Sequence, residues 1–163
     1  MSEDKGHIDV DLAAQRLVFR AGDGQCYEYS VSTSRYGAGE QEGSHCTPRG
    51  HHRIRARIGA GAACGAVFRG RRPTGEIYSP QLAAEYPDRD WILSRILWLG
   101  GCEPGKNRYG QVDSQRRYIY IHGTPDSEPM GRPASIGCIR MRNDEIIDLF
   151  ERVQSGTTVL IHE

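Results

Sequence analysis

Two residues that could carry acyl-transfer chemistry stand close together in the second half of the sequence. Cys138 lies in the run Ser135-Ile-Gly-Cys-Ile-Arg-Met141, and His122 follows a strand-like segment at residues 118–121. A thiol attacks as its thiolate, so it needs a neighbouring base or a cationic setting. The loop at residues 125–133 is long enough to fold back and bring the two side chains together. This pattern predicts Cys138 as a nucleophile and His122 as its base.

The residues around Cys138 suit this chemistry. Arg140 and Arg142 place positive charge near the thiol, and Gly137 lets a substrate approach its backbone closely. The main-chain N–H groups of Gly137 and Cys138 could bind an oxyanion. A cysteine beside a glycine is nevertheless more often a small buried residue, and a histidine after a strand is more often a polar tip. Spacing alone therefore leaves the structural and the catalytic interpretations open.

Alternating segments predict the strands that position these residues. Residues 8–19 alternate and then turn at residues 13–15, residues 26–33 alternate again, and Arg20-Ala-Gly-Asp-Gly24 supplies a hairpin turn. Further strands are expected at residues 53–58, 92–99, 118–121 and 157–161. Together they predict a mainly β fold for a single domain over residues 1–163.

One or two short helices and a long loop complete the prediction. The Ser79-Pro80 pair is typical of a helix start, and that helix should reach about Tyr86. Asn143 is expected to cap a second helix that ends at Gly156. The polar loop at residues 34–52 is expected to form a flexible rim near the cleft.

The composition narrows the partners and the compartment. Lys plus Arg and Asp plus Glu both number 21, so the formal net charge is zero, which argues against general binding of nucleic acid or of an anionic membrane. The chain starts with acidic and alternating residues, and no stretch has the length and apolarity of a membrane span. Five irregularly spaced cysteines suit free thiols in a reducing compartment. We therefore expect a cytoplasmic protein, although an exported enzyme without its leader would look the same.

The segments at His122-Gly-Thr and at Ser135-Ile-Gly-Cys-Ile-Arg-Met141 closely resemble the signature of YkuD-type L,D-transpeptidases. Other segments match the usual layout of this family in order along most of the chain: Ile8-Asp-Val-Asp-Leu with Gln15, Thr47-Pro-Arg-Gly50, Leu97-Trp-Leu-Gly-Gly101 and Arg117-Tyr-Ile-Tyr-Ile-His122. The resemblance implies a compact YkuD-like mixed β-sheet or sandwich with the cysteine near its rim.

The resemblance also implies a substrate and a set of roles. Family enzymes attack the bond between a diamino acid and a terminal D-alanine in a peptidoglycan stem peptide. Cys138 would be acylated, His122 would act as the base, and the Gly123 carbonyl would hold the imidazole tautomer. Arg140 would bind a substrate carboxylate through its planar guanidinium. Further substrate-binding residues are predicted at Tyr120, Thr124 and Ser135.

One position departs from the family pattern. Ile136 stands where many members carry a histidine, and this puts the acceptor step in doubt more than the acylation. With the expected compartment, it favours hydrolysis of soluble tetrapeptides by an L,D-carboxypeptidase in wall recycling, with exchange of D-amino acids as the same chemistry.

Three alternatives remain open at this stage. The first is an L,D-transpeptidase that cross-links or modifies peptidoglycan. The second is a non-catalytic module that binds muropeptides, and the third is a redox sensor with Cys102 as its resolving cysteine. No cofactor is predicted. No metal site is predicted either, because His45, Cys46, His51, His52 and Cys64 lack a ligand spacing typical of zinc.

Overall fold

The computed structural model describes residues 4–163, so the first three residues of the acidic start lie outside the described part of the chain. In chain order the elements are β1 (His7–Asp11), β2 (Arg16–Arg20), β3 (Cys26–Ser30), β4 (Gly50–Ile58), β5 (Ala66–Arg69), β6 (Arg72–Ile77), α1 (Pro80–Glu85), β7 (Ile92–Gly101), the 3-10 helix η1 (Gly110–Val112), β8 (Tyr120–Gly123), β9 (Ile139–Met141), α2 (Asn143–Arg152) and β10 (Thr158–His162).

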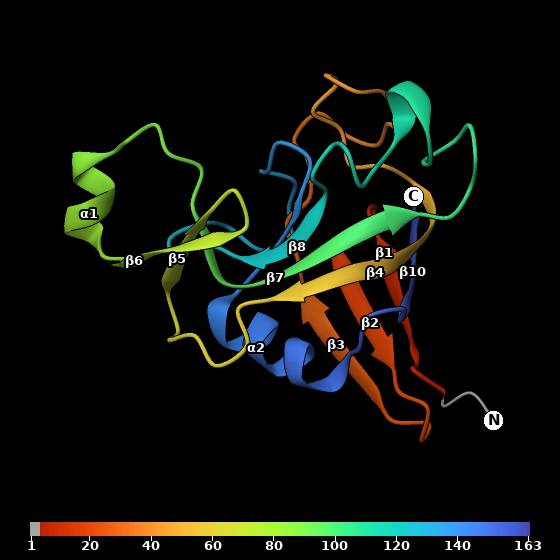
Figure 1. Ribbon diagram of the computed structural model, residues 1–163, viewed down its shortest axis with the longest axis horizontal. Coiled ribbons are helices and arrows are strands. Elements are labelled where there is room, and N and C mark those ends of the chain that lie inside the picture. Colours follow the sequence, from red (N-terminus) through yellow and green to blue (C-terminus); the bar gives the residue numbers. More distant parts are fainter. Residues whose placement is uncertain (1–3) are drawn as a thin grey trace.

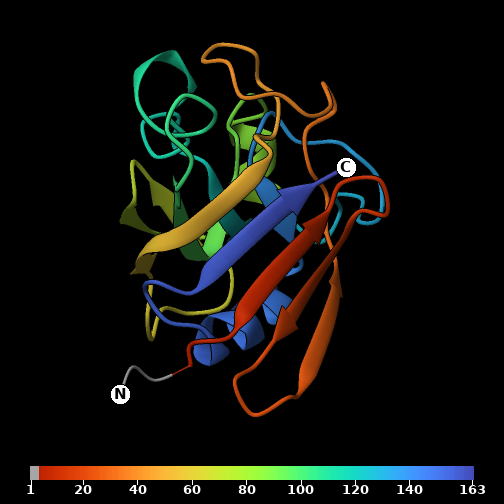
Figure 2. The same cartoon turned by 90° about the vertical axis from the view of Figure 1, so that its right-hand side faces the viewer.

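The strands form one mixed sheet. Its main path runs β3-β2-β1-β10-β4-β7-β5-β6, and β8 joins β7 on a branch that continues to β9. The β1–β10 and β8–β9 pairs are parallel, whereas the other pairs are antiparallel. The sheet curls strongly, and α2 packs against its inner face (Figures 1 and 2). This confirms the predicted mainly β fold with a mixed sheet and short helices.

The main core lies between α2 and the inner face of the sheet. Fully buried side chains from β1, β2 and β10 meet the apolar face of α2, where Ile146, Leu149 and Phe150 are buried. Burial of each large apolar side chain contributes roughly 1.5–3 kcal/mol. This core holds β8 and β9 firmly, because Ile121 and Ile139 belong to it. Within residues 4–163, no helix is long and apolar enough to cross a membrane.

Most of the predicted elements are confirmed. β2 and β3 form the expected hairpin, with Ala21 N donating to Gln25 O at 2.9 Å across the turn. Ser79 caps α1, because its hydroxyl accepts from Leu82 N at 3.0 Å. The strand expected at residues 92–99 is β7, which continues to Gly101. The sequence did not predict β5, β6 or β9.

The prediction that Asn143 caps α2 is wrong. Arg142 is the N-cap, and Asn143 is the first residue of the helix. Its Nδ2 donates to Thr124 O at 2.9 Å, and its Oδ1 accepts from Ser94 Oγ at 2.6 Å. Asn143 therefore ties the end of β8 to β7, and this tertiary role overrides its local preference for capping.

Candidate active site

The thiol of Cys138 lies against the strand that carries His122. Cys138 immediately precedes β9, and the parallel register places Ile139 beside Ile121 of β8. Tyr120 N donates to Cys138 Sγ at 3.3 Å, and the thiol donates to Tyr118 O at 3.4 Å. The main chain of residues 118–120 therefore holds the thiol through one donor and one acceptor.

Alternation along the two strands puts Cys138 and His122 on the same face of the sheet. Ile121 and Ile139 point into the main core, whereas Cys138 packs with Tyr120 in a second apolar cluster. His122 lies two residues beyond Tyr120, so its side chain projects from the same face as Tyr120. The structure thus places the two residues that the sequence singled out for chemistry on one face of neighbouring chain segments, and their catalytic roles stay predictions.

The His122 imidazole is oriented by its own strand. Its Nδ1 lies 2.6 Å from Gly123 O, and a carbonyl can only accept, so Nδ1 carries the proton. The Nε2 lone pair is then the one that can take a proton from a thiol. Burial lowers the pKa of His122, and this is opposed by the Asp90 carboxylate and by the bond to Gly123. The ring is therefore neutral at neutral pH, as a general base must be.

The Cys138 thiol is also neutral in this resting arrangement. Burial raises its pKa to about 12, although the Tyr120 N–H and the cations of Arg140 and Arg117 favour the thiolate. A buried neutral pair of this kind favours proton transfer during the attack over a stable thiolate–imidazolium ion pair.

The turn before Cys138 is held by Ser135. The Ser135 hydroxyl donates to Cys138 O at 2.6 Å and accepts a longer bond of 3.3 Å from Gly137 N. Gly137 has a φ of 134°, in a region that favours glycine. An oxyanion at this turn could replace the long bond to Gly137 N, but the predicted oxyanion role of Gly137 and Cys138 stays a prediction.

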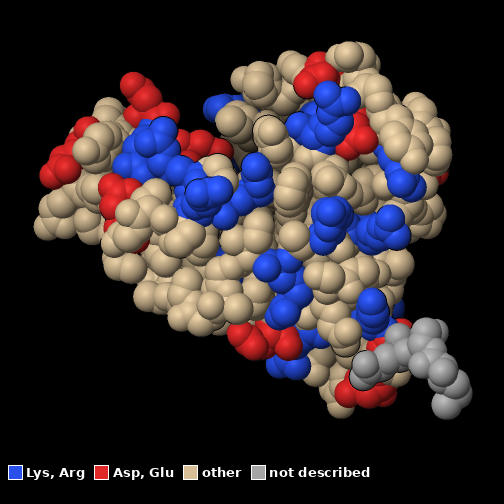
Figure 3. Space-filling model, viewed as in Figure 1, with Lys and Arg blue, Asp and Glu red and all other residues tan. Residues whose placement is uncertain are grey.

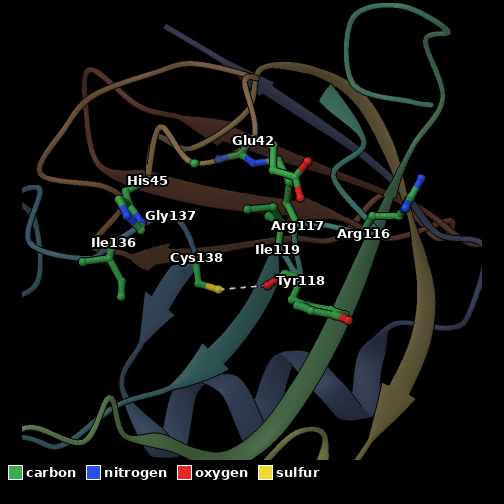
Figure 4. Close-up of a pocket in the computed structure, with 10 residues that line it drawn as sticks. Glu42, His45, Arg116, Arg117, Tyr118, Ile119, Ile136, Gly137 and Cys138 are labelled. Carbon is green, nitrogen blue, oxygen red and sulfur yellow. Dashed lines mark hydrogen bonds between the residues drawn. The ribbon is translucent and has the colours of Figure 1, made fainter. Parts of the chain in front are cut away.

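A cavity of about 270 Å³ opens at Cys138 (Figure 4). Its walls come from three loops that are distant in the sequence: Glu42, Gly43 and His45; Arg116, Arg117, Tyr118 and Ile119; and Ile136, Gly137 and Cys138. His45 and Ile136 lie at one side of the sulfur in the close-up, and Arg116 lies at the other. The position that departs from the family motif therefore faces this pocket, and a histidine from another loop lines it too.

Hydrogen bonds hold the loop above the pocket. Arg117 donates to Cys46 O at 2.7 Å and to Glu40 O at 3.2 Å. Thr47 Oγ1 donates to Gly137 O at 2.9 Å, which fastens the same loop to the turn before Cys138. The loop does border the cleft, as expected, but this bonding indicates a fixed wall more than a flexible rim.

Arg140 is bound to two carboxylates of the protein itself. Its guanidinium lies 3.1 Å from Asp90 Oδ1 and 3.4 Å from Glu128 Oε2, and it is largely buried. A substrate carboxylate would have to join or displace these partners. Binding of a substrate carboxylate by Arg140 therefore stays a prediction. Its ion pairs with Asp90 and Glu128 give this residue a structural role.

The other predicted substrate-binding residues are buried outside the pocket lining. The Tyr120 hydroxyl accepts from Arg71 at 2.9 Å, and the Thr124 main chain bonds to Met141 and Asn143. The Ser135 hydroxyl is engaged within the turn before Cys138. In this conformation these side chains support the site from behind, and contact with substrate stays a prediction for each.

The structure also bears on the redox alternative. All five cysteines are free, and Cys102 lies four residues past Trp98, the β7 residue that pairs with Tyr120. Four strand residues span roughly 13 Å. A disulfide requires Cα atoms within about 7 Å of each other. Cys102 is therefore badly placed to resolve an oxidised Cys138.

The curled sheet with a thiol and an imidazole on neighbouring strands matches one protein family along nearly the whole chain. The model of the YkuD family, described as the L,D-transpeptidase catalytic domain, matches residues 5–161. The chain belongs to this family.

Relatives in Bacillus subtilis (strain 168) share a short segment with the chain. YqjB, named as an L,D-transpeptidase, is 54% identical over 45 residues, which cover 28% of this chain and 26% of YqjB. YkuD, also named as an L,D-transpeptidase, is 40% identical over 47 residues, or 29% of each chain. The aligned segments thus span under a third of these relatives.

Solved structures share the fold over the whole chain. An L,D-transpeptidase from Enterococcus faecium matches with a TM-score of 0.58 and 18% identity, over 98% of this chain and 50% of that one. L,D-transpeptidase 3 from Mycobacterium tuberculosis matches with a TM-score of 0.58 and 14% identity, over 98% and 62%. An L,D-transpeptidase from Mycobacterium smegmatis matches with a TM-score of 0.55 and 16% identity, over 98% of this chain and 59% of that one. At these identities the likeness concerns the fold.

Proposed function

We propose that this domain is a cysteine-dependent acyl-transfer enzyme that acts on peptidoglycan stem peptides. One observation supports this most strongly. Cys138 lines an open pocket, and its sulfur accepts a hydrogen bond from the backbone of the strand that carries His122. Family membership suggests the substrate class, and the geometry suggests which residues act on it.

The proposed reaction has two halves. Cys138 Sγ attacks the carbonyl that joins the diamino acid to D-alanine, while His122 Nε2 takes the thiol proton. The tetrahedral intermediate collapses to a thioester, and the same proton goes to the departing amine of D-alanine. Water then attacks the thioester, His122 takes its proton and returns it to the sulfur, and the shortened peptide leaves as an acid.

We further propose that water is the main acceptor, so that the enzyme releases a tripeptide and D-alanine from soluble tetrapeptides. Ile136 supports this, because it is apolar and 39% exposed at the rim of the pocket. An amine acceptor has to outcompete water at about 55 M, which requires positioning by polar groups. Ile136 offers none.

Transfer to an amine is the second candidate, and His45 favours it. This imidazole lines the same pocket and lies near Ile136 in the close-up (Figure 4). It could orient or deprotonate an incoming amine from the loop at residues 34–52. Hydrolysis and transfer would share one thioester, so the distinction between them is kinetic.

Mass spectrometry of the products separates these possibilities. A disaccharide-tetrapeptide is incubated with the enzyme alone, with a D-amino acid, and with a millimolar peptide acceptor. We expect tripeptide to dominate in all three incubations and Cys138→Ala to be inactive. Dominance of a cross-linked dimer would replace hydrolysis by transpeptidation. Binding without any release of D-alanine would favour the non-catalytic module.

A further inference from the structure

A groove leads away from Cys138 across the outer surface of β4 and β7. The pocket at Cys138 shares Glu42, Arg116 and Tyr118 with a neighbouring cavity of about 460 Å³, which also contacts Trp98 and Arg71. That cavity shares Gln115 and Arg116 with a third one of about 320 Å³. The three cavities therefore adjoin one another in a row that begins at the sulfur.

The far end of this path is rich in arginine. Arg53 and Arg55 of β4 and Arg108 and Arg116 of the loop after β7 line the third cavity. Basic side chains gather over the middle of this face, where β4 and β7 lie (Figure 3). In the part of the chain that the structure describes, none of the four guanidiniums lies within 4.0 Å of a carboxylate.

The acidic residue of the third cavity, Asp113, is in the described part of the chain not ion-paired with these arginines. Asp113 Oδ2 accepts from Tyr109 N at 2.7 Å, and Asp113 Oδ1 accepts from Arg116 N at 3.0 Å. Both carboxylate oxygens therefore serve the turn of their own loop. Glu42 is the other acid along the path, and it lies at the junction with the Cys138 pocket, away from Arg53 and Arg55.

The shape of the groove suits a flexible anionic chain. Arg53 and Arg55 are both exposed on β4 and both line this cavity, although the pairing of β4 with β7 is irregular between Ile54 and Ala56. Gly100 pairs with Arg53 and lines the same cavity without a side chain. A Cβ at this position would lie 3.3 Å from Gln115 Oε1 and would narrow the groove. Tyr118, 53% exposed, offers a ring beside the path between the sulfur and the arginines.

We propose that this basic groove, lined by Arg53, Arg55, Arg108 and Arg116, binds carboxylates on the peptide arm of a substrate that is engaged at Cys138. The assignment rests on the proposed function. Guanidinium groups bind carboxylates through paired hydrogen bonds. The continuity with the Cys138 pocket favours a peptide substrate over nucleic acid, and the zero net charge of the chain points the same way.

Equilibrium binding to Cys138→Ala, which cannot turn substrate over, tests the groove directly. The probes are a disaccharide-tetrapeptide donor and a tripeptide acceptor, each with free carboxylates and with its side carboxylates amidated. The double variant Arg53→Gln/Arg55→Gln should weaken binding of at least one free-carboxylate probe by about ten- to a hundredfold. The double variant should also bind the free-carboxylate and the amidated form of that probe equally well. The probe that responds shows whether the groove binds the donor peptide or the acceptor peptide.

Arg16→Gln/Arg20→Gln, on exposed positions of β2, is the matched control for net charge, and thermal unfolding checks that each variant is folded. Unchanged affinity in the Arg53/Arg55 variant would overturn the inference, as would an equal loss in the control. Tighter binding of a single-stranded oligonucleotide that the same variant abolishes would overturn it in favour of nucleic acid. If the wild type releases no D-alanine, the proposed function fails, whereas this binding contrast still reports on the groove.

Discussion

The main-chain N–H of Tyr120 donates to the sulfur of Cys138 at 3.3 Å. This contact joins the proposed nucleophile to β8 two residues before His122, so the strand that carries the imidazole also holds the thiol. The turn before Cys138 adds a second support, because the Ser135 hydroxyl donates to Cys138 O at 2.6 Å. Acyl transfer benefits when the reacting groups are held in place before the substrate arrives.

His122→Ala should lower the rate of acylation by about 10²–10⁴, the usual effect of losing a positioned base. The release of D-alanine in the first turnover measures this rate. His122→Gln is a useful companion because it keeps much of the buried volume but cannot act as a base. Acylation at the wild-type rate in a folded His122→Gln protein would assign the base to another residue.

The pH profile of acylation should be flat through neutrality. Burial lowers the pKa of His122, so its neutral form persists to a more acidic pH than that of an ordinary histidine near 6.5. The rate should fall only when the pH drops below the lowered pKa of His122, because the ring then becomes protonated. Burial raises the pKa of the Cys138 thiol to about 12, so ionisation of this thiol should add no limb to the profile below pH 9. An acid limb centred above pH 6.5 would contradict the buried neutral pair.

Arg140→Lys should lower kcat/KM about ten- to a hundredfold if the guanidinium reads a substrate carboxylate, since one charge-assisted bond contributes about 1.5–3 kcal/mol. The loss should be much smaller with a substrate whose diamino-acid carboxylate is amidated. Glu128→Gln provides the opposite test, because it removes one internal partner of Arg140 and should lower KM for the free carboxylate. If amidation costs wild type and Arg140→Lys the same factor, Arg140 is a structural residue.

The two residues at the rim of the pocket should control the fate of the thioester. Ile136→His should raise the share of amine-transfer product over tripeptide, because it adds a polar group that can orient an amine. His45→Ala should reduce that share and leave formation of the thioester nearly unchanged. The product ratio at a fixed acceptor concentration measures both effects. Equal ratios in the wild type and both variants would show that acceptor choice is made elsewhere.

Local patterns predicted the parts of the fold that local forces dominate. The hairpin of β2 and β3, the Ser79 cap of α1 and the alternating strands could all be inferred from neighbouring residues. Asn143 shows the limit, because its capping preference was overridden by bonds to Ser94 and Thr124, which are distant in the sequence. The three-residue strand β9 has no pattern of its own and forms through long-range pairing, with β8 on one side and with Ser32 on the other.

The same distinction applies to the site. Cys138, His122 and the carbonyl of Gly123 lie in short motifs and could be chosen from the sequence. Glu42, His45 and Arg116 reach the pocket from loops without any periodic pattern. Long-range bonds position the first of these loops near the sulfur, among them those from Arg117 to Cys46 O and from Thr47 to Gly137 O.

Covalent trapping tests whether Cys138 is the nucleophile. The wild type and Cys138→Ala are incubated with a carbapenem, which resembles the acyl donors of the family, and intact-mass analysis with peptide mapping locates the product. We expect one adduct per wild-type chain, on Cys138, and none on the variant, which should also release no D-alanine from tetrapeptide. An adduct on Cys46, or D-alanine release by correctly folded Cys138→Ala, would contradict the assignment.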